Sequence, residues 1–433
     1  MKMLRLAPLA FVVLFACKKD DNPDNGNGST TFPASARLAG AKVIASNTAG
    51  VNVYNGGYGS SICTVPGEPG SFYLMTDRGP NVDGTLKDSK VFPVPGFNPQ
   101  IGKFKLSGDS LVLVETIGIK SAANTPVTGL PNPAGTGGTG ETALDMSGKT
   151  LNNDPEGIDC EGLTVAADGT FWISDEYGPH ILHLDRSGRT IERINPFGSG
   201  TGGRKLPKVL ATRRANRGME GLTITPDGKT LAGIMQSPLY NPTKDAVKNS
   251  LYTRILTFDI ASGQTKQYLY KLDDKNTANS EITAISNTTF LVLERDGDFP
   301  GDPVKPSTIK RIYKIDLSSA TDVSDATDGA NGKLIDGKTL EVLTDAELQT
   351  ANIKTVSKSI VVDIIKDLPN YPHDKPEGIV LINSSLIALS NDDDFGILPP
   401  DPTNNNFIAK ILPRTGKVDF NTVYFIRLNT PLF

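Results

Sequence analysis

The side chains best suited to chemistry in this sequence are carboxylates that recur with similar neighbours. Glutamates open four β-rich segments, at Glu161, Glu220, Glu281 and Glu377. In each segment a strand, a short turn and a second strand follow the glutamate, as in the range 161–176 with its Asp-Gly turn. Ligand sets made only of oxygen suit a hard cation such as Ca²⁺. We therefore expect these four glutamates to hold a divalent cation, most simply Ca²⁺.

The far end of each hairpin supplies candidates for proton transfer. Because the second strand returns to the start of the first, Glu176 should lie near Glu161, and Glu294 near Glu281. Either Glu176 or Glu294 would accept the proton of an attacking water if crowding raised its pKa. His180 is a third catalytic candidate because it follows Glu176 closely. Packing at the edge of the core is the alternative for this histidine.

Cationic side chains fall at the same strand ends and predict capture of an anion, since guanidinium forks match phosphate or carboxylate groups. We expect five of them to bind substrate: Arg78, Arg217, Arg254, Arg295 and Lys375. The alternative is structural. A Glu-Gly pair at a strand start can simply accept hydrogen bonds from loop amides of the next repeat, with the cations balancing its charge.

The elements that must position these residues repeat along the chain. Copies of the hairpin begin near residues 60, 161, 220, 281 and 377, and further short strands follow each hairpin. Four antiparallel strands repeated radially make a β-propeller, whose innermost strands line a channel and all start on one face. We predict an all-β propeller with five recognisable blades and loop insertions. The longer intervals leave room for six or seven blades.

Both ends of the predicted domain are compatible with β-structure, at 36–45 and 423–427. We expect these ends to pair and to close the ring, because closure removes exposed sheet edges. Within one insertion, Thr344-Asp-Ala-Glu347 is a capping-box pattern that predicts a short helix.

Composition excludes several classes of protein. The 433 residues hold 44 Lys and Arg against 48 Asp and Glu, and a net charge of −4 argues against a nucleic-acid partner. Three cysteines are too few for a disulfide scaffold or a four-cysteine zinc site. Cys63 and Cys160 are expected to be separate buried thiols, although a disulfide between them is open. No serine lies in a G-x-S-x-G motif, which argues against that type of hydrolase.

The first residues predict export. Lys2 and Arg5 precede an apolar run over 6–16, which is too short to span a bilayer. The run ends in Leu-Phe-Ala-Cys17, which resembles a bacterial lipobox. We therefore expect lipidation of Cys17 and anchoring in the cell envelope, at the outer membrane or the cell surface. An ordinary signal peptide with an incidental cysteine is the alternative.

The chain thus divides into three parts: a lipoprotein signal peptide at 1–16, a flexible tether at 17–35 and a propeller domain at 36–433. We expect contact with the membrane through the lipid alone. The propeller itself is expected to be a monomer that takes a small anionic substrate or an ester.

Several motifs together resemble the phytase-like family, described by an esterase-like activity. They are Asp77-Arg-Gly-Pro80, Asp154-Pro-Glu-Gly157, Glu161-Gly-Leu163, Trp172-Ile-Ser-Asp-Glu-Tyr-Gly-Pro179, Asn216-Arg-Gly-Met-Glu-Gly-Leu222, Glu294-Arg-Asp296, Glu377-Gly378 and Asn391-Asp-Asp-Asp-Phe-Gly396. The resemblance covers roughly residues 50–433. It implies a β-propeller, and action on phosphate esters or other esters.

Three functions remain open from the sequence. The first is an exported, surface-anchored hydrolase of phosphate or other esters. The second is a lactonase-like propeller that uses one Ca²⁺ in its channel. The third is a binding module without catalysis, which would be favoured if the 118–155 loop plugged the channel mouth.

Overall fold

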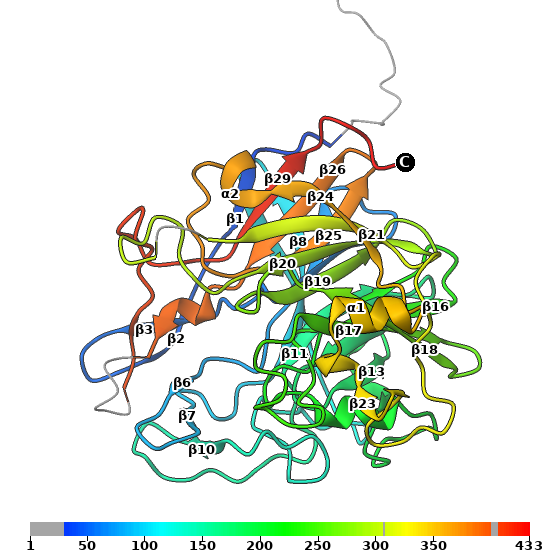
Figure 1. The fold of residues 1–433 in the computed structure, drawn as a ribbon. Helices are drawn as coiled ribbons and strands as arrows, with labels where there is room; N and C mark the ends of the chain where they lie inside the picture. Colours follow the sequence, from blue (N-terminus) through cyan, green and yellow to red (C-terminus); the bar gives the residue numbers. More distant parts are fainter. Residues whose placement is uncertain (1–29, 306–307, 400–405) are drawn as a thin grey trace, which may run out of the picture. The chain divides into compact units, whose positions relative to one another are not determined.

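Four-stranded antiparallel sheets recur five times around a common axis (Figure 1). The computed structural model describes residues 30–305, 308–399 and 406–433, of which 32–433 form one unit. The proposed signal peptide, Cys17 and most of the tether lie outside the described residues.

Each blade runs from an inner strand at the axis to an outer strand at the rim. The first is β4 (Ser61–Thr64), β5 (Ser71–Met75), β8 (Gln100–Ser107) and β9 (Ser110–Gly118). The second is β11 (Cys160–Val165), β12 (Phe171–Asp175), β13 (His180–Leu184) and β14 (Thr190–Ile194). The third is β15 (Met219–Ile224), β16 (Thr230–Met235), β17 (Tyr252–Asp259) and β18 (Thr265–Lys271).

The fourth and fifth blades come last, and the fifth includes a strand from the start of the domain. The fourth is β19 (Ala278–Ala284), β20 (Thr289–Arg295), β21 (Lys310–Asp316) and β24 (Ser357–Asp363). The fifth is β25 (Pro376–Asn383), β26 (Leu386–Asn391), β29 (Thr422–Arg427) and β1 (Ser35–Leu38). The inner strands β4, β11, β15, β19 and β25 contact one another in a closed ring. The predicted propeller is confirmed, with five blades.

The fifth blade contains both ends of the domain, as predicted. In Figure 1 the blue β1 lies beside the red β29, and Ala36 pairs with Val423 in antiparallel register. β1 also pairs in parallel with β9 of the first blade, so the closing strand joins the first and last blades into one sheet. Ala36 is 1% exposed and packs with Phe72 and Phe425 in an apolar cluster that spans both blades.

Shorter strands and helices lie in the segments that connect the blade strands. Small sheets are formed by β2 (Val43–Ser46) with β3 (Asn52–Tyr54), by β6 (Val82–Asp83), β7 (Ser89–Val91) and β10 (Thr142–Leu144), by β22 (Leu334–Ile335) with β23 (Lys338–Thr339), and by β27 (Ile397–Leu398) with β28 (Ile408–Ala409). The helices are η1 (Lys208–Thr212), η2 (Leu340–Val342), α1 (Asp345–Thr350), α2 (Ile364–Asp367) and η3 (Asp394–Gly396). The predicted capping box is present: Thr344 caps α1, with Glu347 as its partner.

Apolar side chains of the inner and middle strands pack between neighbouring blades. Leu163 and Ile173 of the second blade share one cluster with Met75 and Ile101 of the first. Such burial of one sheet face against the next is what ties the blades together. Cys63 and Cys160 lie in this cluster as free, buried thiols, so the preferred expectation of separate cysteines is confirmed. Across the described ranges, no helix has the length and apolar content to cross a bilayer.

Ring closure makes a direct prediction about β1. Ala36→Asp should lower the free energy of unfolding by about 2–4 kcal/mol, because it puts an unpaired charge into the cluster between the first and last blades. Ala34→Asp is the matched control, since Ala34 is exposed two residues earlier and should change stability by no more than about 0.5 kcal/mol. Urea unfolding of both variants measures this. Equal stabilities would contradict a closing role for β1.

Candidate functional site

The recurring glutamates are positioned by β-bulges at the starts of inner strands. In β11 the pairing register shifts between Cys160 and Gly162, which leaves Glu161 as the extra residue. The same shift surrounds Glu220 in β15 and Glu377 in β25. A bulge re-aims the side chain of the extra residue. The three glutamates thereby leave the strand pattern, and all three line the mouth of the channel.

The glycine after each glutamate allows inner strands to touch. A Cβ atom on Gly162 would lie 2.3 Å from the amide nitrogen of Leu222 on the next blade. A Cβ atom on Gly221 would lie 2.4 Å from the amide nitrogen of Ile282. Only glycine fits so close to a neighbouring backbone. The Glu-Gly pair is therefore a bulge that aims a carboxylate, followed by a contact point between blades.

The mouth is a cavity of about 350 Å³ to which all five blades contribute. Ten carboxylates line it, against five cationic side chains. The carboxylates are Asp77, Asp83, Asp159, Glu161, Glu176, Glu220, Asp374, Glu377, Asp392 and Asp394. The cations are Arg78, Lys90, Arg217, Arg295 and Lys375. The mouth is therefore strongly acidic, and it was built by convergence of strand ends as the repeat implied.

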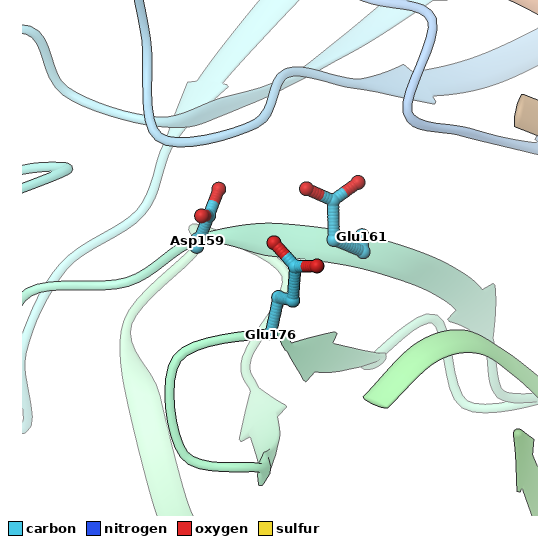
Figure 2. Close-up of side chains that lie close together, drawn as sticks. All are labelled: Asp159, Glu161 and Glu176. Atoms are coloured by element: carbon cyan, nitrogen blue, oxygen red, sulfur yellow. The ribbon is translucent and has the colours of Figure 1, made fainter. Parts of the chain in front are cut away.

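Three carboxylates of the second blade form the tightest acidic group. Figure 2 shows Asp159 at the start of β11, Glu161 within it and Glu176 after the end of β12, with their oxygens facing a common space. One oxygen from each lies within 4.8 Å of the others, and all three residues are buried. This acidic triad could hold a metal ion.

Burial and crowding raise the pKa of every member of the acidic triad. The pKa of Asp159 rises to about 6, chiefly because of burial, although Arg78 opposes the shift. Burial, followed by the charge of Glu220, raises the pKa values of Glu161 and Glu176 well above the usual range. Glu161 accepts no hydrogen bond from any residue that the structure describes. Asp159 therefore has a cationic partner in Arg78, whereas Glu161 and Glu176 have none among the described residues.

Glu220 faces the acidic triad from the third blade. Gln236 Nε2 donates to Oε1 of Glu176 and to Oε1 of Glu220, at 2.8 Å each, and so clamps the two carboxylates together. The other Glu220 oxygen, Oε2, is buried without a partner in the described part of the chain. Burial, with Glu377 next in importance, raises the pKa of Glu220 to about 8.

Most cations at the mouth already have carboxylate partners. Arg78 lies 3.2 Å from Glu141 and 3.5 Å from Asp159. Arg295 pairs with Glu377. Lys375 contacts Asp394 at 2.5 Å and Asp392 at 3.2 Å, and Lys90 contacts Asp83 at 2.6 Å.

Arg217 is the exception. Its guanidinium makes no ion pair or side-chain hydrogen bond with any described residue. Burial and the neighbouring charge of Arg214 lower its pKa. This guanidinium is therefore the cation at the mouth that remains available to an anion, among the described residues.

Four of the residues predicted from sequence do not line the mouth. Glu281 is the most informative, because the bulge in β19 falls at Ser280 and not at Glu281. Ser280 therefore occupies the position of Glu161, while Glu281 occupies that of Gly162. Its carboxylate turns into the channel below the mouth, where it accepts hydrogen bonds from Ser61 Oγ and from backbone amides. Glu281 thus has the structural role given above as the alternative to metal binding, because its carboxylate accepts hydrogen bonds from amides.

Glu294 lies between the third and fourth blades, away from the mouth. Its carboxylate accepts hydrogen bonds from Tyr270, Thr277, Lys358 and the amide of Asp273, all at 2.6–2.8 Å. These four donors saturate it, and the side chain is fully buried. It is not placed to accept a proton from a water in the mouth.

Arg254 and His180 are also structural. Arg254 is fully buried and pairs with Glu341 of the insertion, at 2.6 Å. His180 is 1% exposed; its Nδ1 lies 2.5 Å from Asp175 and its Nε2 lies 3.2 Å from the carbonyl oxygen of Thr136. Burial lowers the pKa of His180. Arg254 and His180 therefore each connect an inserted loop to a blade through polar contacts.

Sequence reasoning missed several residues of the mouth. Asp159 precedes Glu161 by two positions, and that spacing on a strand start was the signal that could have revealed it. Gln236 directly follows β16, so the same hairpin count puts it near Glu220, but a neutral amide carries no charge that would mark it as a site residue. Asp77, Asp374 and Asp394 come from turns after or before strands, where no spacing rule predicts the direction of a side chain.

The chain matches the family described as "Phytase-like: Esterase-like activity of phytase" over residues 55–395. A protein of Arthroderma benhamiae named "Uncharacterized secreted protein" is 27% identical over 376 residues, covering 71% of this chain and 72% of that protein. Among solved structures, a luciferin-regenerating enzyme is 9% identical over 86% of this chain and 78% of its own, with a TM-score of 0.35. Virginiamycin B lyase from Staphylococcus aureus is 11% identical over 90% and 98%, with a TM-score of 0.33. These superpositions are loose and carry no information about activity.

The register of β19 predicts separate roles for two glutamates. Glu281→Gln should lower the free energy of unfolding by about 2–3 kcal/mol, since an amide cannot accept all the hydrogen bonds that this carboxylate accepts. Glu161→Gln, the matched change at the mouth, should leave stability unchanged or raise it by relieving repulsion. Chemical denaturation in the presence of a chelator measures both. A larger loss for Glu161→Gln than for Glu281→Gln would contradict the assignment.

Proposed function

We propose that this chain, which belongs to the phytase-like family, hydrolyses phosphate esters or other esters at the mouth of its propeller. The observation that carries the proposal is the acidic triad of Asp159, Glu161 and Glu176 beside the unpartnered oxygen of Glu220. Buried like charges of this kind are costly unless a cation or a reaction uses them.

The residues present fit a divalent cation, for which Ca²⁺ is our proposal. All donors in the acidic triad are carboxylate oxygens, and no described residue donates a competing hydrogen bond to Glu161. Hard cations prefer such ligands. When bound, the cation would polarise an ester or phosphoryl oxygen and lower the pKa of a water.

Side chains of the mouth would bind the substrate and accept the proton. Arg217 would bind the oxyanion of the substrate, because its guanidinium is free and faces the mouth. Glu220 would accept the proton of the attacking water on Oε2, the oxygen that lacks a partner. Gln236 would hold Glu220 and Glu176 at a fixed separation through its amide. Arg78, Arg295 and Lys375 would support the carboxylates as ion-pair partners.

The openness of the mouth supports an enzyme over a binding module. Of the described residues that line the mouth, none belongs to the 118–155 insertion, so that loop does not plug it. A lactonase-like activity would use the same cation and the same carboxylates. Lactones therefore belong in the substrate panel.

The activity predicts a specific pattern in that panel. Purified residues 32–433 should hydrolyse at least one phosphoester, carboxyl ester or lactone in the presence of Ca²⁺ and lose that activity with a chelator. Glu161→Gln and Arg217→Gln should each lower kcat/KM on the order of a hundredfold. Arg214→Gln is the matched control, because Arg214 is exposed and does not line the mouth. Absence of turnover on the whole panel, or full activity of Glu161→Gln, would contradict the proposal.

We also propose that the chain is exported and anchored by a lipid on Cys17. The support is the apolar run that ends at this cysteine and the polar tether that follows it. The relative from Arthroderma benhamiae, described as secreted, is compatible with export.

Anchoring predicts that the full chain partitions into detergent and that Cys17→Ser abolishes this partitioning, since lipid chains supply the membrane affinity. Detergent phase separation of cells that express either form measures it. Retention of the Cys17→Ser form in the detergent phase would refute lipidation at this residue.

A further inference from the structure

A second hollow adjoins the mouth and is lined in part by the hairpin of β6 and β7. This side groove has a volume of about 530 Å³, and it shares Asp83, Lys90 and Asn216 with the mouth. Its other walls include Leu86, Thr139 and Glu141. Because the two hollows share these three lining residues, the side groove is the neighbouring space into which a substrate held at the acidic triad would extend.

The side groove is polar, and its described lining is net acidic, with Asp83, Asp88 and Glu141 against Lys90. Asp83 pairs with Lys90 at 2.6 Å, and Glu141 pairs with Arg78 at 3.2 Å. Of the described lining residues, Leu86 alone has a large apolar side chain, and none is aromatic. Carboxylate, hydroxyl and amide side chains can all hydrogen-bond to hydroxyl groups, so these walls suit a neutral, hydroxyl-rich group better than a fatty acyl chain, an aromatic ring or an anion.

Asn216 stands at the junction between the mouth and the side groove. Its Oδ1 is buried without a partner among the described residues, which is costly for a polar atom. Its backbone has φ of +51°, a left-handed conformation that is strained for most residues. Nearby, a Cβ atom on Gly218 would lie 2.1 Å from the carbonyl oxygen of Glu176, so this turn packs directly against the acidic triad.

We propose that Asn216 recognises a hydroxyl group of a neutral saccharide whose ester is presented to the acidic triad. This inference rests on the proposed function for the reaction, and it adds the class of the alcohol portion and the residue that selects it. A hydroxyl group can donate to the amide oxygen or accept from the amide nitrogen, so it satisfies either end of Asn216. A buried amide left unpaired by a substrate without that hydroxyl would discriminate against it.

Asn216→Gly isolates this role from folding, because glycine adopts positive φ without strain. The substrate pair is acetylated xylotriose, which carries a saccharide, and ethyl acetate, which does not. For Asn216→Gly, kcat/KM on acetylated xylotriose should fall about tenfold or more relative to kcat/KM on ethyl acetate, with the Tm unchanged. Asn216→Asp, which keeps an acceptor oxygen and tolerates positive φ, should retain the preference. Equal losses on both substrates, or no loss on either, would overturn the assignment.

Binding without turnover separates this inference from the proposed function. Calorimetric titration with xylotriose should show binding to the wild-type protein and binding at least about tenfold weaker to Asn216→Gly. If every ester resists hydrolysis while xylotriose binding still depends on Asn216, the proposed function fails and the saccharide site stands. Equal xylotriose affinity for both proteins, or none for the wild type, overturns the saccharide site whatever the result of the hydrolysis assays.

Discussion

Mutual repulsion among buried carboxylates at one end of the propeller axis is the constraint around which this structure is organised. The carboxylates below the mouth and those at the mouth differ in how far hydrogen bonds compensate this repulsion. Below the mouth, Glu281 is satisfied by backbone amides and by Ser61, which itself accepts a hydrogen bond from Leu163 N. That single carboxylate ties four of the five blades around the axis. At the mouth, Glu161 and one oxygen of Glu220 lack such partners in the part of the chain that the structure describes.

Buried ion pairs form the framework around the unpaired carboxylates. In the fifth blade Lys410 is completely buried and contacts Asp374, Asp394 and Asp419 at 2.7–3.3 Å. This ammonium group fixes the turn after β26, where Asp394 and Phe395 both have positive φ. Strained backbone of this kind persists only where the surroundings determine it. Lys410 thus holds the fifth-blade side of the mouth, while Arg78 contacts Asp159 and Gln236 donates to Glu176 within the acidic triad.

The propeller and the general position of the mouth could be predicted because they follow from local pattern. Hairpins with Asp-Gly turns repeat, and strand ends must converge when strands are arranged radially. The register of individual residues could not be predicted by the same means. Comparing the repeats by their glutamates puts the copy that contains Glu281 one residue out of register. In the structure Ile282 and Thr283 match Leu163 and Thr164. Glu281 therefore takes the position of a glycine.

The remaining misplaced residues share another physical cause. The hairpin count placed Glu294 correctly at the end of β20, opposite Asn279. A count along the chain does not say which side of the sheet a terminal side chain takes, and Glu294 turns toward Tyr270 of the preceding blade. Arg254 and His180 were drawn away from the mouth by inserted loops, whose course has no signature in the repeat. Asp159 was overlooked because it precedes the copied segment.

The central claim is that the acidic triad binds a divalent cation. Anomalous X-ray diffraction from crystals of residues 32–433 soaked in Ca²⁺ tests it most directly, because the signal locates the ion without reference to activity. We predict a strong anomalous peak between Asp159, Glu161 and Glu176, with oxygen distances of about 2.3–2.6 Å. An empty mouth at saturating Ca²⁺, or a peak found only at other sites, would contradict the account.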